Sequence, residues 1–126
     1  MYQENILDHY KNPRNHGRID NATVHHHEYN PLCGDKIDIF LVIENDKIKD
    51  IKFYGNGCAI SQASASMLTE EIKGKALDEI KKITKEKILE LLGIELSPVR
   101  LKCALLGLDT LRNSIRIYEQ YVDDKK

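Results

Sequence analysis

The chain has 126 residues, of which 41% are hydrophobic and 31% are charged, and its formal net charge is -1. A chain of this length and composition is expected to fold as one domain over residues 1–126, with a substantial core. The near-neutral charge argues against a nucleic-acid-binding protein, and no apolar run approaches the length of a membrane span. Residues 1–5 carry neither a basic region nor an apolar stretch, so we see no export signal and expect a cytoplasmic protein.

The N-terminal part of the chain predicts a short helix and a first strand. Apolar residues recur at helical spacing over residues 2–10, and Pro13 ends this helix. The expected strand, over residues 22–29, contains three consecutive histidines. In a strand, His25 and His27 share a face and could hold a metal together, although a solvated strand face explains the run equally well.

The most regular pattern in the sequence is a β-hairpin. Isoleucine and leucine occupy every second position over residues 36–44, which predicts a strand with one fully apolar face. The pair Asn45–Asp46 predicts a tight turn, and residues 48–54 return as the second strand.

The segment 55–66 follows the hairpin and contains Cys58 behind two glycines. Its order predicts a tight turn that delivers the thiol to the start of a helix, where unpaired N–H groups and a partial positive charge favour the thiolate. Cys33 and Asp35 precede the hairpin, and antiparallel pairing brings its entry and exit together. These three side chains should therefore converge.

The remainder of the chain is predicted to be helical. Residues 60–72 place their apolar positions on one side of a helix, residues 76–83 form a weaker lysine-rich segment, and residues 84–93 follow as a third helix. The last and longest helix begins at the Ser97–Pro98 pair, and its apolar stripe continues to Val122. Cys103 lies early in this helix, on a face that borders the stripe.

Each of these side chains also has a plain structural interpretation. Cys58 could be a small buried residue in a packed turn. Asp35 could accept hydrogen bonds from the backbone N–H groups of a turn, and Cys103 could be a buried structural thiol. Together with Cys33, however, they supply the four sulfur and oxygen ligands that tetrahedral zinc requires, and thiolate with carboxylate also suits iron. From the residues alone we predict a metal site.

Four motifs carry a resemblance to a known family. They are Asp8–Asn15, Asn30–Asp35, Gly57–Ser61 with Ala63–Ser66, and Pro98–Cys103. In this order they resemble the U-type iron–sulfur cluster assembly scaffold family, which comprises IscU, the N-terminal domain of NifU, and SufU. The resemblance covers essentially the whole chain.

The resemblance implies an α+β fold in which a three-stranded antiparallel sheet has helices packed on one face. It also implies a site made by Cys33, Asp35, Cys58 and Cys103. There the family receives sulfur from a cysteine desulfurase, builds a [2Fe-2S] cluster and passes it to apo iron–sulfur acceptor proteins, and the cluster-free form holds Zn²⁺ or Fe²⁺. Such a protein is a scaffold and not an enzyme, and the resemblance leaves open a homodimer or homotrimer.

Departures from the family pattern place the chain between subgroups. Lys102 stands where IscU-like members have a histidine, and residues 96–100 replace the Leu-Pro-Pro-Val-Lys motif that a dedicated Hsp70 chaperone recognises. The insertion that SufU-like members carry between the second and third cysteines is nevertheless lacking. The alternative function is therefore a zinc-dependent sulfur acceptor, a sulfurtransferase that stimulates a desulfurase, and a structural zinc domain is a third interpretation.

Two finer expectations concern the site chemistry. Cys103 is the first candidate persulfide acceptor, because Lys102 and the nearby helix start favour its thiolate, and Cys58 is the second. Asp35 places a hard oxygen among soft thiolates, which predicts a cluster that is easily released.

Overall fold

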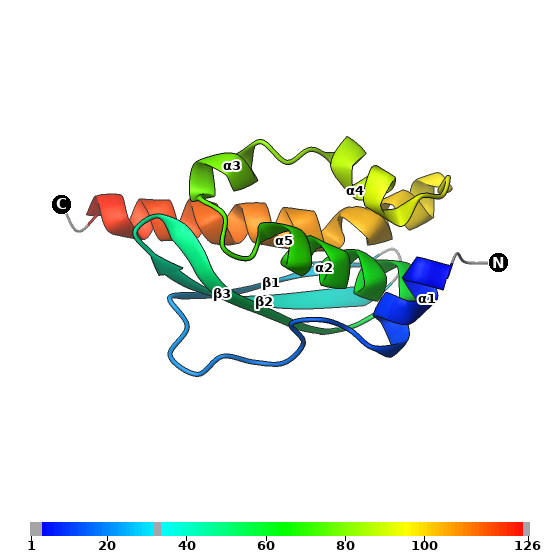
Figure 1. Cartoon of the computed structure of the whole chain (residues 1–126), viewed down its shortest axis with the longest axis horizontal. Helices are drawn as coiled ribbons and strands as arrows, with labels where there is room; N and C mark the ends of the chain where they lie inside the picture. Colours follow the sequence, from blue (N-terminus) through cyan, green and yellow to red (C-terminus); the bar gives the residue numbers. More distant parts are fainter. Residues whose placement is uncertain (1–3, 32–33, 125–126) are drawn as a thin grey trace.

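The computed structural model describes residues 4–31 and 34–124, and the predicted Cys33 ligand and Tyr2 lie outside them. In the described residues the chain forms five helices and one three-stranded sheet (Figure 1). In chain order they are α1 (Glu4–Lys11), β1 (Val24–Asn30), β2 (Asp35–Glu44), β3 (Lys47–Asn56), α2 (Ala59–Ile72), α3 (Leu77–Lys81), α4 (Lys85–Leu92) and α5 (Pro98–Asp124). The predicted α+β class is confirmed.

The sheet is antiparallel throughout, with β2 between β1 and β3. The predicted hairpin joins β2 to β3, and its turn residues Asn45 and Asp46 have φ of 53° and 60°. Positive φ at both central positions matches the right-handed twist of paired strands, which is why asparagine and aspartate suit this turn. The isoleucines and the leucine of the alternating pattern are buried on one face of β2.

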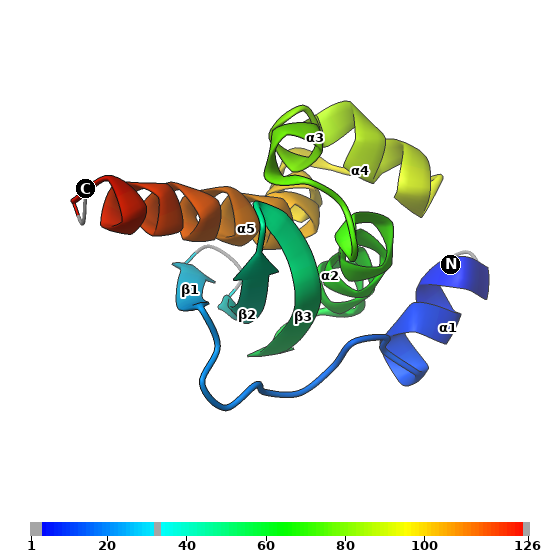
Figure 2. The same ribbon diagram turned by 60° about the vertical axis from the view of Figure 1, so that its left-hand side comes forward.

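Helices α2 and α5 lie together on that apolar face (Figures 1 and 2), and both contact strands of the sheet. The edge of β3 is paired with the segment that leads to β1. Phe53 accepts a hydrogen bond from Gly17 N–H and donates its own N–H to the Asn15 carbonyl. The predicted arrangement, with the helices packed on one face of a three-stranded sheet, is confirmed.

Helix α2 differs from the prediction that only one of its sides is apolar and packed. It is buried around most of its circumference, because α1, α4, α5 and β3 all pack against it. Alanine and serine at six of its positions keep the helix thin enough for these close approaches. The buried hydroxyls stay paired, as shown by Ser64, whose Oγ donates to the Ala104 carbonyl at 2.6 Å.

Helix α5 runs along most of the length of the molecule (Figure 1). Its predicted stripe is buried at Leu108, Leu111 and Ile115, and becomes partly exposed toward Val122. The packed face also includes small residues, among them Gly107, where an added Cβ would lie 3.4 Å from Ala65 of α2. Among the residues described, no helix combines the length and apolar character needed to span a membrane.

We predict that Gly107→Ala raises the free energy of unfolding by about 0.5–1 kcal/mol, because alanine removes the conformational cost of glycine in a helix interior. Its methyl group reaches ordinary contact distance from Ala65. Gly107→Leu should instead lower the free energy of unfolding by about 1–3 kcal/mol, since the helices leave no room for it. Urea denaturation measures both changes. If Gly107→Ala lowers the free energy of unfolding as much as Gly107→Leu does, the two helices approach more closely than described.

Candidate metal centre

Asp35 is the first residue of β2, and only 2% of its surface is exposed. Asn30 of β1 lies opposite it in the sheet, and Lys36 beside it pairs with Asn56 at the end of β3. The carboxylate therefore lies at the end of the sheet where the hairpin opens. A buried carboxylate is costly unless it is hydrogen-bonded, so the partners of Asp35 decide whether the site is stable.

Two glycines allow the chain to pass closely over this carboxylate. A Cβ at Gly57 would lie 2.8 Å from Asp35 Cγ and 2.5 Å from Ser61 Oγ. A Cβ at Gly55 would lie 2.2 Å from the Lys36 carbonyl oxygen. All three distances are shorter than real Cβ contacts permit, so glycine is required at positions 55 and 57 for close approach as well as for the turn. The sequence analysis missed this steric role, although the two glycines before Cys58 were its signal.

Cys58 is the N-cap residue of α2, with extended backbone angles. Its N–H donates to Asp35 Oδ1 at 3.2 Å, and its Sγ lies 3.5 Å from Asp35 Oδ2. The helix N-terminus supplies unpaired N–H groups and a partial positive charge at this corner. Gln62 fixes this corner further, because its Nε2 donates to the Gly55 carbonyl at 2.9 Å. The predicted delivery of Cys58 to a helix start is confirmed.

Cys103 reaches the same point from α5. It lies in the second turn of that helix and is 2% exposed. The hydrogen bond from Ser64 to the carbonyl of Ala104 fixes this turn of α5 against α2. The charge at a helix terminus acts mainly within the first turn, so Cys58 lies within its reach and Cys103, in the second turn of α5, lies beyond it.

One ligand atom each from Asp35, Cys58 and Cys103 lies within 4.8 Å of the other two. Two sulfurs and one carboxylate oxygen form a donor set that suits Zn²⁺ or iron. The three residues come from β2, the start of α2 and α5, which are brought together by the hairpin and by helix packing. Cys33, the fourth predicted ligand, lies in the undescribed segment two residues before Asp35.

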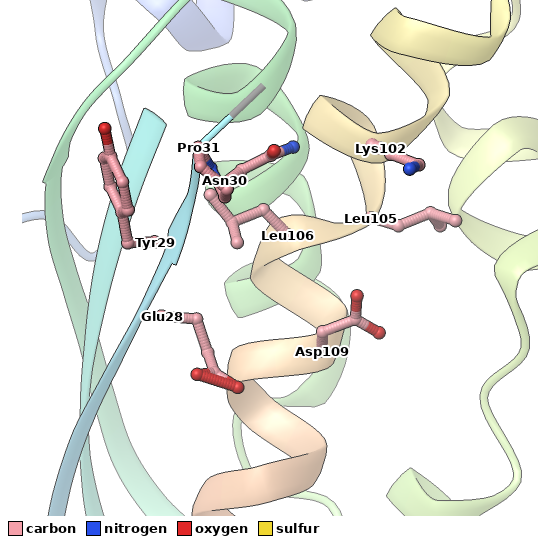
Figure 3. A pocket seen from close by; sticks show the side chains of 8 residues that line it. All are labelled: Glu28, Tyr29, Asn30, Pro31, Lys102, Leu105, Leu106 and Asp109. Carbon is pink, nitrogen blue, oxygen red and sulfur yellow. The ribbon is translucent and has the colours of Figure 1, made fainter. Parts of the chain in front are cut away.

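A cavity of about 440 Å³ opens between the end of β1 and the early turns of α5 (Figure 3). Its lining residues are Glu28, Tyr29, Asn30, Pro31, Lys102, Leu105, Leu106 and Asp109. Burial raises the pKa of Asp109, the Arg112 guanidinium opposes this shift and Glu28 adds to it. Sequence reasoning did not find this cavity, because its two walls are far apart in the chain and share no motif.

Several known proteins are similar to this chain in sequence or in structure. IscU 1 of Archaeoglobus fulgidus, an iron-sulfur cluster assembly scaffold protein, is 41% identical over 118 residues, covering 94% of this chain and 76% of that protein. The zinc-dependent sulfurtransferase SufU of Bacillus subtilis is 36% identical over 132 residues, covering 91% of this chain and 89% of SufU. The crystal structure of a putative iron-sulfur cluster assembly scaffold protein for the SUF system from Fervidobacterium islandicum AW-1 matches with a TM-score of 0.78 and 34% identity, covering 90% of this chain and 96% of that one.

The family model of the NifU-like N terminal domain matches residues 1–125, nearly the whole chain. The fold, the order of the motifs and the named relatives agree with that match, and the resemblance to the U-type scaffolds is confirmed. The chain belongs to the family of NifU-like N-terminal domains.

Proposed function

We propose that this chain is a scaffold for iron–sulfur cluster assembly, acting as a single cytoplasmic domain over residues 1–126. Its relatives are named as cluster assembly scaffolds. The observation that supports the proposal most directly is the meeting of Asp35, Cys58 and Cys103 within 4.8 Å at the open end of the hairpin. Cys33 completes the proposed ligand set, and the [2Fe-2S] cluster is the cargo. Zn²⁺ or Fe²⁺ would be held by the same residues in the cluster-free form.

The proposed reaction sequence begins with sulfur transfer from a cysteine desulfurase. A thiolate of the scaffold attacks the outer sulfur of the desulfurase persulfide, so that a new S–S bond forms on the scaffold and the desulfurase cysteine leaves as a thiolate. We keep Cys103 as the acceptor, because Lys102 lies beside it and lines the adjoining cavity (Figure 3). Cys103 is buried and does not line this cavity, so transfer to it requires neighbouring side chains to move, whereas Cys58 is partly exposed.

Release of the cluster to apo iron–sulfur acceptor proteins is the proposed last step, and Asp35 is the ligand that makes release possible. Carboxylate oxygen is a harder donor than thiolate and binds iron in a cluster less firmly. The same carboxylate is held in place by the Cys58 N–H, so it is available as a ligand without a large rearrangement.

The second candidate function is a zinc-dependent sulfur acceptor that stimulates a cysteine desulfurase. The relative named as a zinc-dependent sulfurtransferase supports it. Lys102 also supports it, because SufU-like members resemble this chain at that position, whereas IscU-like members carry a histidine there. The two functions share the acceptor chemistry and differ in whether iron and sulfide accumulate on the protein.

We predict that protein purified anaerobically without added metal contains iron and acid-labile sulfide in matching amounts, and that Cys58→Ser lowers both to about a tenth or less, since a ligand is lost. Ser61→Ala is the matched control, because Ser61 Oγ lies 3.9 Å from Cys58 Sγ but is not a proposed ligand. Full metal retention in Cys58→Ser would mean that the site is misplaced. Zinc without sulfide would favour the sulfurtransferase function, which a desulfurase stimulation assay then tests.

For cluster release, Asp35→Ala is expected to slow transfer to an apo-ferredoxin by about tenfold or more, because the replaceable oxygen ligand is gone. Absorption and circular dichroism of the receiving ferredoxin follow the rate. Glu44→Ala is the control on the same strand, at the opposite end from Asp35, where the side chain is exposed. Transfer at the wild-type rate by Asp35→Ala would contradict the role of the carboxylate. Thermal unfolding is measured alongside the assay, because the variant removes the carboxylate that accepts the part-buried Cys58 N–H.

Incubation with a cysteine desulfurase and cysteine should add one sulfur atom to Cys103, located by mass spectrometry of alkylated peptides. The Cys103→Ser variant is expected to lose at least about nine-tenths of this label, and Lys102→Gln to reduce its rate. If Cys58 carries the label instead, the thiol at the helix terminus is the acceptor. Persulfide found mainly on Cys33 would overturn both assignments.

A further inference from the structure

The three consecutive histidines of β1 have no part in the proposed cluster chemistry. In the structure they divide between the two faces of the sheet, as the alternation of a strand requires. His26 faces α5, and its Nε2 lies 3.5 Å from Oε2 of Glu28, which accepts a hydrogen bond from Asn113 of α5. His25 and His27 face the other way, and their side chains are 47% and 58% exposed.

Asp38 of β2 lies between these two exposed imidazoles. It is directly opposite His27 in the strand register. Its Oδ1 is 3.0 Å from His25 Nε2 and 3.7 Å from His27 Nδ1, so one oxygen faces nitrogens from both rings. Zn–N and Zn–O bonds of about 2.0–2.1 Å in a tetrahedral site place neighbouring ligand atoms about 3.3 Å apart. The two observed oxygen–nitrogen separations lie on either side of that value. Among the described residues the group whose three ligand atoms already converge is Asp35, Cys58 and Cys103, so the exposed His27 ring must turn to share an ion with His25 and Asp38.

The surroundings restrict two of these groups, His25 and Asp38. The His25 ring stacks on Phe40, with ring centroids 4.1 Å apart and planes 11° from parallel. The second carboxylate oxygen of Asp38 lies 3.9 Å from Lys36 Nζ, so Lys36 neighbours Oδ2 while Oδ1 faces the imidazoles. Restricted side chains lose less conformational entropy when they bind, which favours a ligand site over a mobile cluster of histidines.

The two imidazoles are open to solvent, whereas the Asp38 side chain between them is only 13% exposed. Helices α2 and α5 cover the opposite face (Figures 1 and 2). The segment before β1 contacts the outer face at β3, where Arg18 lies over the Tyr54 ring at 4.8 Å and His16 is near the same ring. An ion at the histidines would therefore keep one or more water ligands.

We propose that His25, His27 and Asp38 form a second metal site, for a borderline divalent transition-metal ion such as Zn²⁺. Two imidazoles and a carboxylate suit zinc and related ions, in contrast to the thiolate-rich set at Asp35. Asp35 and Asp38 are three residues apart on β2, so they face opposite sides of the sheet about 10 Å apart along the strand. The second site therefore binds its ion independently of the first.

Zinc titration of the full chain tests this proposal. Protein already carrying one equivalent of Zn²⁺ is given a second, and free zinc is measured by competition with a chromophoric chelator. The wild type should bind two ions, and the His25→Gln/His27→Gln variant only one. His25→Gln alone, His27→Gln alone and Asp38→Asn should each lower the affinity for the second ion by about tenfold or more. These side chains are at the surface or near it, and circular dichroism checks that each variant is folded.

His26→Gln is the matched control, because it removes a neighbouring imidazole from the other face of the same strand. This variant should still bind the second ion. In the wild type, the NMR signals of the His25 and His27 rings should shift when the second equivalent of zinc is added, while those of His9 and His16 should not. An affinity for the second ion within about twofold of wild type in the double variant would overturn the proposal. An equal loss in His26→Gln would also overturn it. Cys58→Ser affects only the first ion, so failure of the two sites is distinguishable.

Discussion

The contact between the Asp35 carboxylate and the N–H of Cys58 determines the rest of the candidate centre. Because the carboxylate is almost fully buried, it needs this donor, and the donor is available only at the N-terminus of α2. The chain reaches that position by passing within a few ångströms of the carboxylate, which only glycine at position 57 allows. The start of β2, the turn after β3 and the start of α2 are therefore fixed relative to one another by one buried polar contact.

A second constraint brings the remaining thiol to this corner. Cys103 belongs to a helix far along the chain, and its position depends on how closely α5 approaches α2. Small side chains at this contact, Ala65 against Gly107, permit the approach, and the Ser64 hydroxyl fixes the position along the helix through a carbonyl of α5. Helix packing at this depth tolerates little change of volume, so the site geometry and the core share the same residues.

Much of this arrangement could be predicted from local patterns. The alternation in β2, the Asn-Asp turn and the glycines before Cys58 each have a local physical cause, and the hairpin they predict brings Asp35 toward Cys58. The burial of α2 on several sides could not be predicted, because a helix rich in alanine and serine shows no periodicity that reveals how many neighbours it has. The position of Cys103 depended on tertiary packing, and the sequence indicated only that it lies early in a helix. The cavity beside it joins segments that share no pattern.

The alternation of β2 also separates two kinds of ligand environment. Asp35 faces thiols under the helices, whereas Asp38 faces two exposed imidazoles on the other side of the sheet. A buried set of sulfur donors excludes water and selects soft metals, and its ion leaves only when a ligand is replaced. An exposed set of nitrogen donors competes with water at every moment, so its ion exchanges faster and is held less firmly. One strand can therefore place two aspartates in different metal environments, one with sulfur donors and little water and the other with nitrogen donors and solvent. The side-chain period of two makes this possible, because it places the two carboxylates on different faces of the sheet.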